Sequence, residues 1–76
     1  MIMYRVKVRV KKLCEERNWS LNELALRSGV TYTTVRRYAM QPMAKVDIDS
    51  VSRIKETFGC SWDELLELLG DGSFDE

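Results

Sequence analysis

The sequence contains no histidine, only one proline, and no apolar run close to the roughly 20 residues that a membrane-spanning helix requires. Histidine is the side chain whose ordinary pKa lies nearest neutrality, so its absence removes the readiest proton shuttle. No pair of carboxylates lies in an apolar stretch that would tune its acidity either. The N-terminus does not have the layout of a signal peptide. We therefore expect one small cytoplasmic domain without enzyme activity and without a membrane span.

Cysteine is also scarce. Cys14 and Cys60 have neither the CxxC spacing nor the histidine partners of a metal site. We interpret them as reduced, buried, small apolar side chains, and we expect no metal and no cofactor. A disulfide between them is the alternative.

A formal net charge of +0 conceals two oppositely charged halves. Residues 1–45 contain ten Lys and Arg against three Asp and Glu, which gives +7, and residues 46–76 contain two against nine, which gives −7. The first half is suited to face a polyanion, whereas the second is not. Segregated charge also occurs on ordinary solvated surfaces, so the pattern gives only modest support for a polyanionic partner.

The segment "SLNELALRSG" has the marks of a short helix with a defined start and end. Ser20 followed by Glu23 three residues later has the form of a capping box. Gly29 ends the helix, because glycine readily takes the left-handed conformation that closes helix C-termini. Helical spacing places four apolar or small residues on one face, namely Leu21, Leu24, Ala25 and Ser28.

A second helix follows after a very short connection. Thr31 is its expected cap, the helix covers about residues 32–39, and Val35 and Tyr38 lie on its inward face. Two short helices joined by a tight glycine turn predict a helix-turn-helix motif.

Two more helices are expected downstream of Pro42, which interrupts the chain. Asp47 is the expected cap of the first and Gly59 its end, and Ser61 with Glu64 forms a capping box for the second. The apolar positions of the two are Ile48, Val51, Ile54 and Phe58, then Trp62, Leu65, Leu66 and Leu69. Residues 70–76 are glycine-bearing and acidic, and we expect a flexible tail.

The N-terminal segment fits two structures. "VKVRV" alternates like a strand, and valine favours strands, yet helical spacing continues through the strongly helical "KKLCEER". We predict a helix over about Arg9 to Asn18, starting anywhere between Tyr4 and Val8, with a short preceding strand as the alternative. The fold class is therefore all-α, a compact five-helix domain whose second and third helices form the helix-turn-helix.

Two stretches, "LCEERNWSLNELALRSGVTYTTVRRY" and "DIDSVSRIKETFGCSWDELL", resemble the Cro and lambda-repressor family of DNA-binding domains. The resemblance covers about residues 6–69 and implies a DNA-binding domain over residues 1–69. Some positions depart from the family: Leu21 stands where a phosphate-holding glutamine is common. Cys14 and Ala39 replace a frequent arginine–glutamate pair, which predicts an apolar contact instead.

If the third helix enters the major groove, the side chains opposite Val35 face the bases. Arginine suits guanine because its planar fork meets O6 and N7 together, and threonine offers a hydroxyl, or a methyl group to thymine. The expected base-contacting residues are Tyr32, Thr33, Arg36 and Arg37.

Phosphate contacts call for helix N-termini and flexible cations beside the groove, and they set affinity rather than sequence preference. The expected residues are Ser20, Asn22, Arg27, Thr31, Thr34 and Lys45. Other groups have simpler interpretations. Core positions are expected for Trp19, Tyr38, Phe58 and Trp62, and a solvated helix face for Arg5, Lys7, Arg9, Lys11 and Lys12.

The sequence thus favours a protein that binds double-stranded DNA sequence-specifically, a small transcriptional repressor of prokaryotic or phage type. Such domains often bind palindromes as dimers. The expected homodimer surface is the last helix and the tail, through Leu68, Leu69 and Phe74. The alternative is an antitoxin-like or adaptor module whose acidic C-terminal half binds a protein partner.

Overall fold

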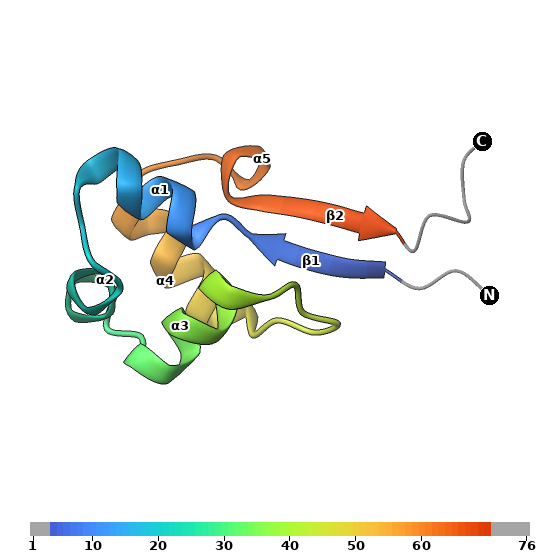
Figure 1. Ribbon diagram of the computed structural model, residues 1–76, viewed down its shortest axis with the longest axis horizontal. Coiled ribbons are helices and arrows are strands. Elements are labelled where there is room, and N and C mark those ends of the chain that lie inside the picture. Colours follow the sequence, from blue (N-terminus) through green and yellow to red (C-terminus); the bar gives the residue numbers. More distant parts are fainter. Residues whose placement is uncertain (1–3, 71–76) are drawn as a thin grey trace.

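The computed structural model describes residues 4–70, and the expected tail beyond them lies outside the described residues. Five helices stand between two strands in chain order (Figure 1). The elements are β1 (Tyr4–Val8), α1 (Val10–Arg17), α2 (Leu21–Ser28), α3 (Tyr32–Met40), α4 (Ile48–Phe58), α5 (Trp62–Leu65) and β2 (Leu66–Gly70).

The helix-turn-helix of α2 and α3 is confirmed, and local signals set its limits. The Ser20 hydroxyl oxygen accepts a hydrogen bond from the Glu23 amide at 3.0 Å, and Gly29 ends α2 with φ of 76°. Thr31 caps α3 by accepting from the Thr34 amide at 3.4 Å. The capping box expected at Ser20 is only half formed, because the Glu23 carboxylate accepts from Arg27 at 2.6 Å instead.

The helix α4 also begins and ends where the sequence predicts. Asp47 accepts from the Ser50 amide and hydroxyl, and Gly59 ends the helix with φ of 69°. Val51, Ile54 and Phe58 are buried, as expected. Ile48 is not, since it is 67% exposed; its position in the first turn places it beyond the edge of the core.

The C-terminal segment departs most from the prediction. The capping box of Ser61 and Glu64 is complete, but α5 ends at Leu65 after four residues, and Leu66–Gly70 forms β2 instead of a further helical turn. The cause is a partner distant in sequence, because β2 pairs antiparallel with β1, with Tyr4 opposite Gly70 and Val8 opposite Leu66. Gly70 therefore belongs to the sheet and not to a tail.

Trp62 also differs from its expected core position. Its side chain is 42% exposed, and the Lys55 ammonium lies 5.3 Å from the ring centroid. In a helix of only four residues, Leu65 alone reaches the core, while Trp62 covers the surface beside α4.

At the N-terminus, the alternative strand is confirmed and the helix starts later than predicted, at Val10. The alternating valines form β1, and one edge of this strand pairs with β2. On the opposite edge, Val6 exchanges backbone hydrogen bonds with Met43 at 2.7 and 2.8 Å. The two strands extend to one side of the helices (Figure 1). The fold is therefore mostly helical with a small two-stranded sheet.

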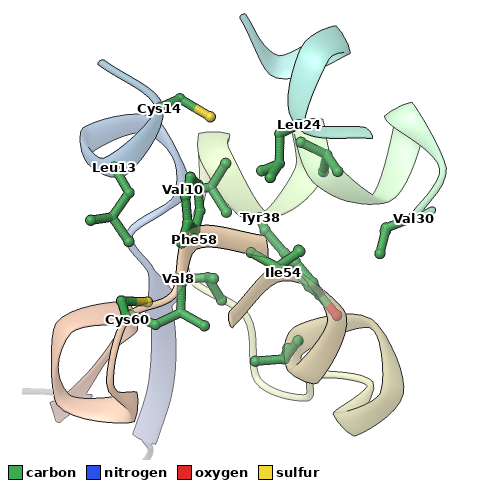
Figure 2. Close-up of a cluster of buried hydrophobic side chains, with 13 residues drawn as sticks. Val8, Val10, Leu13, Cys14, Leu24, Val30, Tyr38, Ile54, Phe58 and Cys60 are labelled. Atoms are coloured by element: carbon green, nitrogen blue, oxygen red, sulfur yellow. The ribbon is translucent and has the colours of Figure 1, made fainter. Parts of the chain in front are cut away.

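The core brings together side chains from all of these elements (Figure 2). Leu24, Val35, Ile54 and Leu65 are fully buried in it. The two cysteines are free and buried, at opposite ends of the cluster in Figure 2, so the reduced interpretation holds and the disulfide does not. Three other core expectations hold in full or in part: Tyr38 and Phe58 are buried, and Trp19 is half-buried, stacked 5.7 Å from Phe58.

Candidate nucleic-acid interface

The helix α3 has one face in the core and the opposite face in solvent. Val35 and Tyr38 are buried, and the Tyr38 hydroxyl accepts a hydrogen bond from the Asp47 amide at 3.1 Å. This bond ties the C-terminal half of α3 to the start of α4. Anchored in this way, α3 presents a fixed outer face.

The predicted base-contacting residues all lie on that outer face. Tyr32, Thr33, Arg36 and Arg37 are exposed, and together with Met40 and Gln41 they line one open hollow. Neither arginine makes an ion pair or a side-chain hydrogen bond with another residue in the range 4–70. Two guanidinium groups are thus free to meet acceptors brought by a partner.

The predicted phosphate-contacting residues fall into two groups. Ser20 and Asn22 are exposed at the start of α2, and Lys45 is exposed in the connection between α3 and α4. Thr31 and Thr34 use their hydroxyl groups on each other, with 3.0 Å between the two Oγ1 atoms, and Thr34 is half-buried.

Arg27 is held more firmly than the sequence suggests. Its Nε donates to the Glu23 carboxylate at 2.6 Å, and its guanidinium lies 4.6 Å from the centroid of the Trp19 ring. A phosphate at Arg27 would have to compete with Glu23, so this residue has less freedom to bind an anion than Lys45.

Met40 also borders this face. Met40 is 60% exposed and lines three open hollows at once: the one on α3, one beside Ser20 and Leu21 at the start of α2, and one beside α1 and β1. Cys14 and Ala39 both line the hollow at α2, and Ala39 packs against the core cluster that contains Cys14.

Three lysines expected on a plain solvated face also border these hollows, namely Lys7, Lys11 and Lys12. No spacing along the chain could indicate this, because it depends on how β1 and α1 pack beside the end of α3.

Comparison with known proteins agrees with this geometry. Residues 9–71 match the family described as Cro/C1-type HTH DNA-binding domain, which implies that the chain binds DNA. The family consists of DNA-binding domains and not of enzymes. No curated protein matches the chain, and no solved structure does. Within residues 4–70, no helix has the length and apolar character to cross a membrane.

Proposed function

We propose that this chain, which belongs to the Cro/C1-type family of helix-turn-helix DNA-binding domains, is a sequence-specific repressor that places α3 in the major groove of double-stranded DNA. The observation that carries the proposal is the outer face of α3, where two unpaired arginines stand beside Tyr32 and Thr33 on a helix fixed from behind. An α-helix fits the width of the major groove, and the second helix of such a motif is the one that enters it.

Each side chain of that face has a distinct role in the proposal. Arg37 and Arg36 donate pairs of hydrogen bonds to guanine, Thr33 donates its hydroxyl to a base acceptor or packs its methyl group against that of thymine, and Tyr32 borders the same bases. A good bidentate contact discriminates against a wrong base by about 1–3 kcal/mol. These four residues would therefore determine the sequence preference.

The backbone contacts come from residues around α3. Ser20 and Asn22 hold a phosphate at the N-terminus of α2, where amide donors and the helix dipole favour an anion. Lys45 reaches the backbone from the loop after α3, while Thr31, Thr34 and Arg27 stand beside the groove with part of their hydrogen bonding already used. Such contacts position the protein without reading sequence.

Repression then follows from occupancy of a site on DNA by the domain over residues 1–69, as in small prokaryotic or phage regulators. A homodimer would bind a palindrome with its two copies of α3 about 34 Å apart. Of the surface first expected to form it, the last helix ends at Leu65, Leu68 and Leu69 belong to β2, and Phe74 lies outside the described residues. The outer edge of β2 is open among the described residues, and Leu68 beside it is 66% exposed. Two such edges can pair antiparallel about a two-fold axis.

Selection of bound fragments from randomised duplex DNA tests the proposal. The wild type should enrich one preferred site with two inverted half-sites, each containing guanine. Arg37→Lys is the informative variant, because lysine keeps the charge but loses the planar fork. It should relax the preference at one position per half-site while leaving the salt dependence of binding unchanged. No enrichment by the wild type, or identical sites for the two proteins, would contradict the proposed base reading.

A further inference from the structure

A hollow bordered by lysines lies where the start of α1 and the strand β1 approach the end of α3. Its apolar floor includes Val8 and Tyr38, and Met40 and Gln41 form its border with α3. Lys7 from β1 and Lys11 and Lys12 from α1 line it. Three residues far apart from α3 in sequence thereby meet one surface beside it.

The charges around this hollow do not cancel. Arg9 pairs with Glu67 at 3.4 Å and also donates to the Asp63 and Glu64 carbonyl oxygens at 2.9 and 3.3 Å. That leaves Glu15 as the unpaired acid, against the three lysines. None of the three makes an ion pair or a side-chain hydrogen bond with another residue in the described part of the chain. The remaining charge is therefore +3 from lysines and −1 from Glu15, a net +2.

This surface is continuous with the one assigned to DNA. Met40 lines both the lysine-bordered hollow and the hollow on α3. Lys11 lines the former and also the hollow at the start of α2, where Ser20 and Leu21 lie. Leu21 offers no side-chain hydrogen bond there, and Lys11 is the cation that lines this hollow.

We propose that Lys7, Lys11 and Lys12 bind backbone phosphates of the same duplex that α3 reads, and so extend the contact beyond the helix-turn-helix. The inference rests on the proposed function, because it assumes that α3 lies in the groove. Lysine suits this role, since a compact ammonium on a flexible stem can follow phosphates of any sequence. The negative charge of Glu15 repels the phosphates of the DNA strand. The lysines add affinity and salt dependence but no sequence preference.

The test measures binding to a duplex of mixed sequence by fluorescence anisotropy over a series of salt concentrations. Lys7→Ala, Lys11→Ala and Lys12→Ala are compared with Lys55→Ala, which removes the same charge from α4, away from the hollow. Each lost phosphate contact should lower the salt slope by about 0.9, so a tenfold rise in salt should cost the wild type roughly eightfold more affinity than the variant. Lys55→Ala should keep the wild-type slope.

The acids of α1 give a second matched pair. Glu15 lines the hollow and Glu16 does not, although both are exposed. Glu15→Gln should tighten binding to this duplex, and Glu16→Gln should change it less. Circular dichroism would verify that every variant is folded.

Equal slopes for the three lysine variants and the wild type, or an equal loss in Lys55→Ala, would overturn the inference. The Arg36→Ala, Arg37→Ala double variant separates this result from the proposed function. If it loses binding while the lysine variants do not, the inference alone fails. If it binds like the wild type while the lysine variants lose affinity, the placement of α3 fails, and with it the claim that the lysines extend an α3 contact, although they still bind DNA.

Discussion

The basic and acidic halves of the chain carry charges of equal size and use them differently. In the second half, four of the six acidic residues between positions 47 and 67 are occupied within the fold, as caps or as ion-pair partners. They are Asp47, Asp49, Glu64 and Glu67. In the first half, the side chains of seven cations make no ion pair or hydrogen bond with any described residue. They are Arg5, Lys7, Lys11, Lys12, Arg36, Arg37 and Lys45.

These four acidic residues therefore take part in the protein's own structure. Hydrogen bonds from the Ser50 hydroxyl and amide hold the pKa of Asp47 below its ordinary value. Glu64 completes the capping box of α5, and Glu67 receives Arg9 from across the sheet. Binding of a protein partner by the acidic half stays a prediction, because Asp71, Asp75 and Glu76 lie outside the described residues. The seven unpaired cations, by contrast, include the residues that we propose to contact DNA.

The largest effect that separates the halves is expected from the Arg36→Ala, Arg37→Ala double variant. Each lost base contact costs about 1–3 kcal/mol, so affinity for the preferred site should fall roughly thirtyfold or more. The free energy of unfolding should stay within about 0.5 kcal/mol of the wild type, because both side chains are exposed and unpaired. Anisotropy measures the first quantity and urea unfolding the second.

A large loss of stability in this double variant would show that Arg36 and Arg37 also stabilise the fold. The contrast between acidic side chains used within the fold and basic side chains left unpaired would then be wrong.

Two serine caps, Ser20 in the basic half and Ser61 in the acidic half, give a second comparison with smaller expected effects. Ser61→Ala should lower the free energy of unfolding by about 1 kcal/mol, because the cap of α5 is lost, and leave DNA affinity unchanged. Ser20→Ala should lower stability by a similar amount and weaken DNA binding as well. Urea unfolding and anisotropy measured on both variants distinguish these outcomes.

Ser52→Ala is the control, since Ser52 lies within α4 and caps no helix. Unchanged DNA affinity in Ser20→Ala would remove Ser20 from the phosphate contacts.

The smallest expected effect is on the pH dependence of the free energy of unfolding. It involves one thiol in each half and is absent near neutral pH. Burial raises the pKa of Cys14 and of Cys60 above the ordinary value of 9.0, while the Arg17 charge opposes the rise at Cys14 and Glu64 adds to it at Cys60. A group with a raised pKa contributes stability that is fully present below its unfolded pKa and is lost as pH rises through the folded pKa. Stability should therefore fall above about pH 9.

Urea unfolding at a series of pH values checks this expectation. The Cys14→Ala, Cys60→Ala double variant should show a shallower decline than the wild type, whatever its stability at neutral pH. Parallel curves would contradict the assignment of the decline to the thiols.

Much of the fold could be predicted because its signals are local. The caps at Ser20, Thr31, Asp47 and Ser61 each depend on a residue three positions away, and all four form. The end of α5 could not be predicted in this way. Leu65, Leu66 and Leu69 have helical spacing, and only pairing with a strand more than 50 residues earlier places Leu66 and Leu69 in β2.

The candidate site also has one part that local signals predict and one part that depends on distant packing. Exposure of Arg36 and Arg37 follows from helical geometry once Val35 is placed in the core, and the sequence predicts it correctly. The lysine-bordered hollow depends instead on the packing of β1 and α1 against the end of α3. Periodicity describes one helix at a time, so it cannot tell which of many surface lysines gather beside another helix.

The pairing of β1 with β2 also has a consequence for biosynthesis. β1 is the first described element to leave the ribosome and β2 the last, so the sheet closes only after Gly70 has been translated. Until then the β2-facing edge of β1 stays unpaired, while the bridge between Val6 and Met43 already covers the opposite edge. A stalled or truncated nascent chain would keep that open edge, and such unpaired strands are prone to aggregate.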